Sequence, residues 1–270
     1  MSNKQAPLKL GWFSTGRGEG SYGLLKAAVD AISSGELAAT IEYVFINREK
    51  GQASGSDRFI KYVESLSVPL VAFSSRRFRR EHGNRPWPEL RDDFDRAVLD
   101  LIGRFEVDVT VNAGYMLIAP LICQRTLMIN LHPALPGGPI GIWQDVILEL
   151  IQKRAEESGA MVHIVTEEVD GGPVLSYCRF GLHGAGMTGL WEETANLPPA
   201  RLEDGPGQEL PLFREIRRLT LMRERPLVVE TLKALAERRI DVSRAATGAA
   251  VDLTDVVEAA VGATPSDQSP

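Results

Sequence analysis

The sequence is poor in cysteine and histidine, the residues that form disulfides and bind many transition metals. Its two cysteines, Cys123 and Cys178, stand in apolar surroundings without a CxxC spacing. We therefore expect two buried free thiols, which fits a reducing cytoplasm. The four histidines are too scattered to match the spacing of zinc ligands, so we expect no metal site. These histidines are His82, His132, His163 and His183.

Long apolar runs and an excess of basic residues are also missing. No run approaches the roughly 20 apolar residues of a membrane-spanning helix, and residues 1–7 contain no apolar signal core. The net charge of −6 argues against nucleic acid as the main partner, because phosphate binding needs a basic surface. We therefore expect a cytoplasmic protein with neither a membrane nor a nucleic-acid partner. The sequence does not give the oligomeric state, and a homodimer stays open.

Apolar and charged residues make up 44% and 24% of the chain, as in an ordinary globular protein. Short β-branched stretches alternate with segments of helical periodicity along its first half. This alternation predicts an α/β fold, doubly wound around a mostly parallel sheet with helices on both faces. The expected strands cover residues 8–14, 40–47, 68–73, 107–111 and 126–131, and the expected helices cover 22–32, 59–66 and 92–105.

The second half of the chain shows a different pattern. After a helix over 143–155, strands at 159–166 and 174–180 follow each other across an Asp-Gly-Gly-Pro turn, which favours a more antiparallel edge. A helix over 212–238 is expected to be broken or capped at Pro226. The remaining expectations are loops over 74–88 and 183–207, a single α/β domain over 1–240, and a partly disordered C-terminal tail over 241–270.

Polar side chains stand where one expected strand ends, in the stretch Asn130-Leu131-His132-Pro133. Side chains two apart on a strand point to the same face, so Asn130 and His132 can reach one pocket. Pro133 keeps the backbone of His132 extended. Ligands of open α/β sheets bind outside the carboxyl ends of the strands, where this amide and imidazole could stabilise an oxyanion and deliver a proton. The alternative is a structural histidine at a strand end.

A carboxylate, Asp170, precedes Gly171-Gly172-Pro173 after a later strand. Its loop could fold back so that Asp170 joins the amide and the imidazole, whereas an isolated Asp-Gly pair is usually a plain turn. His163 lies in the strand before this loop, among Val, Ile and Met residues. We expect His163 to be packed behind the reacting groups rather than to react itself.

Two further segments allow two interpretations each. The turn from Thr15 to Ser21 (TGRGEGS) joins a strand to a helix, where glycines and a helix N-terminus can hold a phosphate. It lacks the Gly-Lys-Ser/Thr ending of a Walker A loop and departs from GxGxxG, so a tight structural turn is equally compatible. The basic run from Arg76 to Arg80 (RRFRR) is either a solvated loop or a contact to an anion or substrate.

The stretches NLHPALP (130–136) and HIVTEEVDGGPV (163–174) together resemble the folate-dependent formyltransferases. Within that family they look most like the glycinamide ribonucleotide formyltransferases of purine synthesis. Three further segments are also similar to the family: residues 18–21 with the following helix, 111–116 (VNAGYM) and 226–239. The likeness therefore extends over most of residues 8–240. The paired NxHP and HxVTxxxDxGP motifs are specific, whereas the glycine loop is not.

The resemblance implies a Rossmann-type formyltransferase fold and an enzyme that uses 10-formyltetrahydrofolate as co-substrate and no metal. The formyl group would pass to a primary amine that carries a phosphate. The implied catalytic set is Asn130, His132 and Asp170. The implied contacts at the acceptor's phosphate are Gly18, Gly20 and Ser21. The implied lining of the folate cleft is Met116, Leu117 and Ile118, with the loop 165–170 closing over the pteridine.

Departures from the family pattern alter the implied acceptor pocket. Gly137-Gly138-Pro139 follows Leu135-Pro136, and the glycine loop carries two extra residues. Leu117 replaces an arginine, and Leu221 stands where a glutamate would reach the ribose hydroxyls. Glycinamide ribonucleotide is the first acceptor to consider, and a nucleotide-linked amino sugar is an alternative. A non-catalytic folate- or nucleotide-binding module is a third, which would bind folate and leave every amine untouched.

Overall fold

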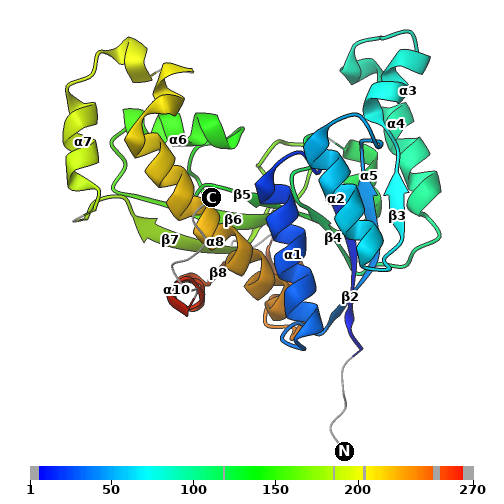
Figure 1. Cartoon of the computed structure of the whole chain (residues 1–270). Coiled ribbons are helices and arrows are strands. Elements are labelled where there is room, and N and C mark those ends of the chain that lie inside the picture. Colours follow the sequence, from blue (N-terminus) through cyan, green and yellow to red (C-terminus); the bar gives the residue numbers. More distant parts are fainter. Residues whose placement is uncertain (1–5, 118, 185, 203–204, 246–249, 264–270) are drawn as a thin grey trace, which may run out of the picture. The chain divides into compact units, whose positions relative to one another are not determined.

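The computed structural model describes residues 6–117, 119–184, 186–202, 205–245 and 250–263 (Figure 1). Its strands form a mixed, mostly parallel eight-stranded sheet in the order β3-β2-β1-β4-β5-β6-β7-β8, which confirms the predicted α/β class. The chain divides into two compact units. The first comprises Met1–Asn130, Ile164–Gly172 and Leu232–Arg239, and the second comprises Leu131–His163, Pro173–Thr231 and Ile240–Pro270.

The first unit alternates strands and helices, and its neighbouring strands are all parallel. In chain order the elements are β1 (Leu8–Ser14), α1 (Glu19–Ser33), β2 (Ala39–Ile46), α2 (Ser54–Ser65), β3 (Leu70–Ala72), α3 (Ser75–Glu81), α4 (Trp87–Ile102), β4 (Val109–Asn112) and α5 (Pro120–Arg125). They are followed by β5 (Met128–His132).

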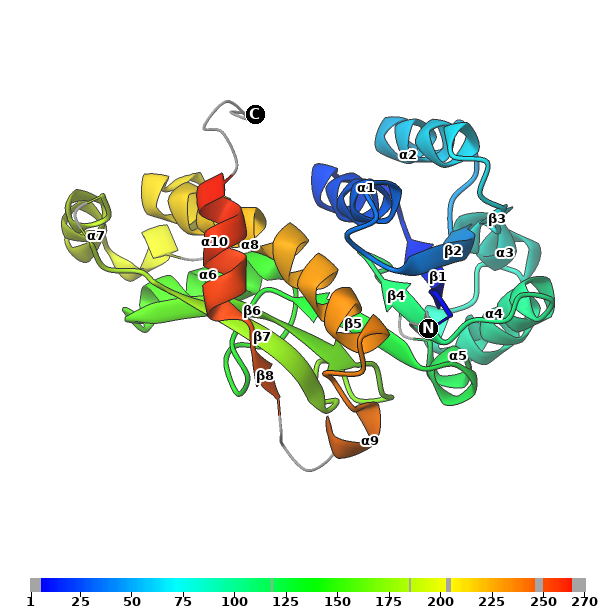
Figure 2. The same cartoon turned by 90° about the horizontal axis from the view of Figure 1, so that it is seen from below.

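Helices cover both faces of this parallel sheet. The adjacent residues Trp12 and Phe13 of β1 point to opposite faces and are both fully buried, as expected of a strand covered on two sides. Figure 2 shows α1 and α2 on one face and α4 and α5 on the other. Phe13 packs on the second face with Phe45 of β2 and Phe94 of α4 in one hydrophobic cluster. The strand-helix alternation of the sequence therefore produces the doubly wound arrangement.

The strand order creates a switch point within this unit. The chain places β2 and β3 on one side of β1, and β4 and β5 on its other side. β1 pairs with β4 from Leu10–Val109 to Phe13–Asn112. Ligands of open α/β sheets bind outside the carboxyl ends of the strands at such a reversal of order. The loops that follow β1 and β4 are therefore the expected binding loops of the unit.

A buried carboxylate joins two helices on the second face of the sheet. Asp95 of α4 is fully buried, and its Oδ2 atom accepts a hydrogen bond from the backbone N–H of Leu121 at 3.0 Å. Burial raises the pKa of Asp95 to about 6, although the backbone N–H groups of Leu121 and Ile122 act in the opposite direction. The carboxylate therefore accepts a hydrogen bond from a backbone N–H at the start of α5, which has no partner within the helix. Its own burial destabilises its charged form.

The second unit holds the mixed part of the sheet. β6 runs antiparallel to β7, as the sequence predicts, while β7 and β8 are parallel. A hydrophobic cluster forms between α6, β7 and the start of α8, with Val146, Phe180 and Phe213 among its members. In chain order, the helices and strands after β5 are α6 (Trp143–Gln152), β6 (Glu157–Ile164), β7 (Val174–Gly181), α7 (Thr188–Ala195), α8 (Pro211–Ala236), α9 (Val242–Ala245), β8 (Val251–Asp252) and α10 (Thr254–Ala263).

The prediction of a loop over residues 74–88 is wrong, because this segment holds α3 and the start of α4. The Ser74 hydroxyl caps α3 by accepting a hydrogen bond from the backbone N–H of Arg77 at 3.1 Å. Phe78 is buried, with its ring centroid 5.3 Å from that of Phe94. A single apolar residue among five thus anchors a basic helix to the core.

Two other segments are more regular than expected. The loop-rich stretch 183–207 contains α7, which Trp191 fixes by donating its indole N–H to the carbonyl oxygen of Leu182 at 2.7 Å. α8 continues through Pro226 instead of breaking there. Proline removes one backbone donor, but Leu227 and Val228 are buried, so tertiary packing maintains the helix.

The division into a domain over 1–240 and a tail over 241–270 stays a prediction. Within 241–263 the structure describes α9, β8 and α10, while residues 246–249 and 264–270 lie outside the described residues. The guanidinium of Arg223 on α8 pairs with Glu258 of α10 and lies 4.3 Å from the ring centroid of Phe180. Among the described helices, none is long and apolar enough to cross a membrane.

Both cysteines are free thiols, as the sequence predicts, but the prediction that both are buried holds only for Cys178. Cys178 on β7 is fully buried, and burial raises its pKa to about 11. Cys123 on α5 is only partly buried, and its pKa is also raised by burial. Neither thiol is therefore readily ionised at neutral pH.

Candidate active site

Asn130 and His132 lie at the carboxyl end of β5, as predicted. They are two residues apart on one strand, so both side chains leave the same face of the sheet. Asn130 stands opposite Asn112, the last residue of β4, in the parallel ladder. His132 is 2% exposed, whereas Asn130 is partly exposed. The strand thus presents an amide and a shielded imidazole side by side.

The imidazole of His132 is fixed by a backbone carbonyl. Its Nε2 atom lies 2.8 Å from the carbonyl oxygen of Pro139. Because a carbonyl oxygen only accepts hydrogen bonds, Nε2 carries the hydrogen in both the neutral and the charged ring. The hydrogen bond thus fixes the orientation of the ring.

His163 of β6 packs beside this ring. The two ring centroids are 6.5 Å apart and the rings are close to perpendicular, at 80°. His163 is 2% exposed. The structure therefore places His163 against His132, and its role as a packed supporting residue stays a prediction.

The loop that carries Asp170 starts beside β5. The backbone N–H of Val165 donates to the carbonyl oxygen of Met128 at 2.8 Å, two residues before Asn130. Asp170 adopts a left-handed conformation with φ 53°, which aspartate tolerates better than most residues. At Gly172 a Cβ atom would lie 1.8 Å from the carbonyl oxygen of Ile164, so the return of the loop requires glycine. The loop is thus a tightly specified turn, and the catalytic role of Asp170 stays a prediction.

The predicted phosphate loop lies at the switch point, after β1. Gly18 is the N-cap of α1 and has no side-chain cap, so backbone N–H groups of the first turn lack an intrahelical partner. A Cβ atom at Gly18 would meet nothing within 4 Å. Gly16 has φ 63°, and a Cβ there would lie 2.9 Å from Phe59. Gly16 is therefore a structural requirement, whereas Gly18 is open.

Two of the predicted binding segments, the glycine loop after β1 and the loop after β4, contact each other at the start of α1. The hydroxyl oxygen of Ser21 lies 2.3 Å from where a Cβ of Gly114 would stand, so Gly114 lets the loop after β4 approach α1. The backbone N–H of Thr15 donates to the carbonyl oxygen of Gly114 at 3.1 Å. The side chain of Asn112 stabilises this loop by accepting a hydrogen bond from the backbone N–H of Tyr115 at 3.0 Å.

The three residues predicted to line a folate cleft differ in their surroundings. Met116 is 64% exposed, which is unusual for a large apolar side chain and leaves it available to a ligand. Leu117 instead packs against the hydrophobic cluster of the first unit. Ile118 lies outside the described residues.

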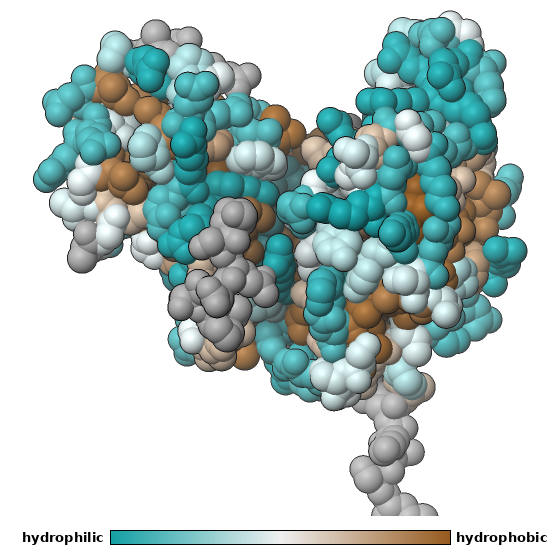
Figure 3. All heavy atoms as spheres, viewed as in Figure 1, coloured by the Kyte–Doolittle hydropathy of each residue, from teal (hydrophilic) through white to brown (hydrophobic). Residues whose placement is uncertain are grey.

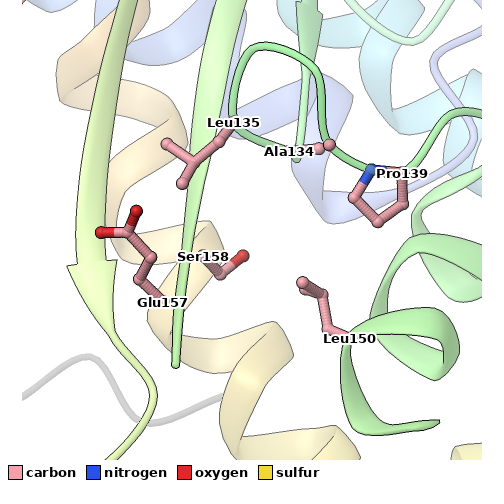
Figure 4. Close-up of a pocket in the computed structure, with 7 residues that line it drawn as sticks. Ala134, Leu135, Pro139, Leu150, Glu157 and Ser158 are labelled. Carbon is pink, nitrogen blue, oxygen red and sulfur yellow. The ribbon is translucent and has the colours of Figure 1, made fainter. Parts of the chain in front are cut away.

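No sequence motif indicates a role for Pro139, whose carbonyl holds His132. Figure 4 shows that Pro139 also lines a small pocket of about 80 Å³, together with Leu150 of α6 and Ser158 of β6. The Ser158 hydroxyl is buried and has no hydrogen-bond partner among the described residues. The segment that follows β5 therefore both holds the imidazole of His132 and lines this pocket.

The described residues contain no group of three or more His, Cys, Asp or Glu side chains placed to hold a metal ion. The donors at the end of β5 are an amide and an imidazole. Such groups suit hydrogen bonding to a developing oxyanion and transfer of a proton. They fit a group-transfer reaction at a carbonyl carbon.

Comparison with known proteins shows which family the chain belongs to. Residues 18–179 match the model of the Formyl transferase family, and this range contains every candidate site residue. The chain is 30% identical over 162 residues to a phosphoribosylglycinamide formyltransferase of Dictyostelium discoideum, which spans 56% of the chain and 74% of that protein. It is 29% identical over 155 residues to the enzyme of that name from Escherichia coli (strain K12), spanning 56% of the chain and 64% of the relative.

The likeness to solved structures extends beyond the matched segment. A crystal structure of glycinamide ribonucleotide transformylase 1 from Symbiobacterium toebii superimposes with a TM-score of 0.65. It is 18% identical and covers 90% of this chain and 93% of its own, so it establishes the shared fold. With the family match over more than half of its length, the chain belongs to the Formyl transferase family of enzymes.

Proposed function

We propose that the protein transfers the formyl group of 10-formyltetrahydrofolate to a primary amine that carries a phosphate. The observation that carries this proposal is the pair Asn130 and His132 on one face of β5, with the Nε2–H of His132 held by Pro139. An amide donor and an imidazole with a defined proton site are the groups that formyl transfer needs.

In the proposed reaction the neutral amine attacks the formyl carbon, and a new C–N bond forms. The carbonyl oxygen becomes an oxyanion, to which the side-chain NH₂ of Asn130 and a protonated His132 donate. The bond from the formyl carbon to the folate nitrogen then breaks, and the proton lost by the amine is delivered to that nitrogen. Asp170 favours the charged imidazole and assists this transfer. Each oxyanion donor of this kind contributes a rate factor of about 10² to 10³.

The acceptor's phosphate is proposed to bind at the start of α1. Gly18, Gly20 and Ser21 bring backbone N–H groups and the positive end of the helix dipole to this place. Exposed Met116 supplies apolar surface for the folate, beside Leu117 and Ile118 in sequence. Phosphate and folate would then occupy the two loops that meet at Gly114.

Glycinamide ribonucleotide is the acceptor named by the relatives and the first one to test. With this acceptor the protein would act in purine synthesis, and we propose that it does so in the cytoplasm. A nucleotide-linked amino sugar is a second candidate. It is favoured by the basic residues described below.

The test is to incubate the protein with 10-formyltetrahydrofolate and a panel of phosphate-bearing amines, and to follow release of tetrahydrofolate. We expect release that depends on one amine and is lost with Asn130→Ala. A reaction without amine serves as the control for hydrolysis. Folate binding without release for any amine would overturn the proposal in favour of a non-catalytic module.

A further inference from the structure

Three arginines stand at the carboxyl ends of three neighbouring parallel strands. Arg17 follows β1, Arg48 follows β2 and Arg76 follows β3, and these strands lie side by side in the order β3-β2-β1. Because parallel strands end at one edge of the sheet, their following residues share that edge. It is the edge that also carries the glycine loop.

Backbone hydrogen bonds tie the three strand ends together. The N–H of Asn47 donates to the carbonyl oxygen of Ser14 at 3.4 Å, and the N–H of Ser75 donates to the carbonyl oxygen of Asn47 at 3.3 Å. On the other side, the Ser56 hydroxyl donates to the carbonyl oxygen of Thr15 at 3.0 Å. The residues next to the three arginines are thus fixed to one another.

Arg48 is held in the middle of this edge. Its Nη1 atom donates to the Ser75 hydroxyl at 2.9 Å and to the carbonyl oxygen of Asn47 at 2.8 Å. Its Nε atom is buried and has no partner among the described residues. Burial lowers the pKa of Arg48, and the positive charges of Arg76 and Arg17 lower it further. The three guanidinium groups therefore repel one another across the edge.

The nearby carboxylates do not neutralise these arginines. Glu49 pairs with Arg77 at 2.7 Å, and Glu19 pairs with Arg58. Within the described ranges, no salt bridge is formed by Arg17, Arg48 or Arg76. Figure 3 shows a hydrophilic surface over α3, the helix that carries Arg76. Positive charge that no carboxylate neutralises, at the rim of a binding edge, suits an anionic ligand.

We propose that Arg17, Arg48 and Arg76 form a second anion subsite beside the glycine loop, which binds the second phosphate of a diphosphate-bearing acceptor. The proposal rests on the proposed function, since it extends the acceptor site beyond the phosphate at α1. One phosphate is served by the helix N-terminus alone. Three further guanidinium groups match the additional charge and the oxygen geometry of a diphosphate.

Inorganic pyrophosphate and inorganic phosphate are the probes, and calorimetric titration at low ionic strength is the measurement. Binding does not require formyl transfer, so failure of the catalytic proposal leaves this test intact. We expect pyrophosphate to bind at least tenfold more tightly than phosphate. Arg48→Gln and Arg76→Gln should each weaken pyrophosphate binding about tenfold, which corresponds to about 1.4 kcal/mol.

Arg79→Gln is the matched control, because it removes one charge from the same helix at a side chain that donates to the carbonyl oxygen of Arg85. It should leave pyrophosphate binding within twofold. Arg48→Lys keeps the charge but loses the planar fork and should give an intermediate affinity, which separates a binding defect from a folding defect. Equal weakening by Arg48→Gln and Arg79→Gln would overturn the subsite. Citrate binding as tightly as pyrophosphate would overturn the diphosphate assignment in favour of carboxylates.

Discussion

The carbonyl oxygen of Pro139 lies 2.8 Å from the Nε2 atom of His132 and accepts the hydrogen bond that this nitrogen donates. The imidazole is therefore held by a backbone group seven residues further along the chain. We expect a change in Gly137-Gly138-Pro139 to shift the position of the ring without removing any side chain of the proposed site.

His132→Asn should retain slightly more activity than His132→Ala. The Asn amide occupies roughly the place of Nδ1 and can donate to the oxyanion, but it cannot carry a proton. We expect kcat to fall by about 10² to 10³ in the Asn variant and further in the Ala variant. Steady-state kinetics of the wild type and both variants at one pH measures the difference.

His163→Asn serves as the comparison for this experiment. Because His163 is buried against the ring of His132, its replacement should lower the melting temperature more than it lowers kcat. A folded His163 variant without turnover, alongside a fully active His132 variant, would show that the catalytic imidazole is the other one.

Asp170→Asn should leave the protein folded but slow turnover by about 10² to 10⁴. Asparagine accepts the left-handed backbone of this position almost as readily as aspartate, so the loop keeps its conformation. Glu168→Gln is the control, as it removes an exposed charge from the same loop. Melting curves test whether both variants are folded, and kcat measures the effect on turnover. Near wild-type turnover in Asp170→Asn would show that its carboxylate is not catalytic.

Gly18→Val and Gly16→Ala should separate binding from folding in the glycine loop. Gly18 has extended backbone and open space, so valine should be tolerated in the fold while raising the acceptor KM about tenfold and leaving the folate KM nearly unchanged. Gly16 has positive φ and meets Phe59, so alanine should cost about 2 kcal/mol of stability or more. Equal changes in both KM values for Gly18→Val would indicate a structural turn.

Asp95→Asn should change how stability depends on pH. The folded pKa of Asp95, about 6, exceeds its ordinary value of 3.8, so the folded state binds the proton more tightly than the unfolded state. Stability from this group is therefore full below about pH 4 and is lost as pH rises to about 6, by at most about 3 kcal/mol. Asparagine can still accept from the N–H of Leu121 without this loss.

The measurement is the melting temperature of both proteins at pH 4 and pH 8. We expect the difference between Asp95→Asn and wild type to grow in favour of the variant as the pH rises. A constant difference at both pH values would mean that Asp95 has an ordinary pKa in the folded protein.

The sequence predicts the parallel core well because its signals are local. The strand 8–14 is found at its predicted bounds, since a nearly continuous apolar run marks a strand buried on two faces. The pair Asn130 and His132 also follows from strand periodicity alone. The start of α1 was expected at Tyr22 but lies at Glu19, because glycine-rich first turns carry no apolar periodicity.

Contacts between residues that are not neighbours in the chain determine the features that sequence patterns do not predict. α3 has one buried aromatic residue, Phe78, among charged neighbours, and its burial depends in part on Phe94 of the next helix. α8 continues through Pro226 because tertiary packing stabilises it, and no local sequence pattern indicates that packing. The link between Pro139 and His132 is a backbone contact, so side-chain motifs cannot reveal it.

The ionisation of the two thiols has a practical consequence. Burial raises the pKa of both Cys178 and Cys123, so very little of either thiol is ionised at pH 7. Maleimide and disulfide dyes react with the thiolate and therefore label the unmodified chain slowly. A third cysteine introduced at exposed Glu168 would ionise near the ordinary thiol pKa and react first. The Asp170 loop can therefore be given a site-specific fluorescent reporter without first removing the native cysteines.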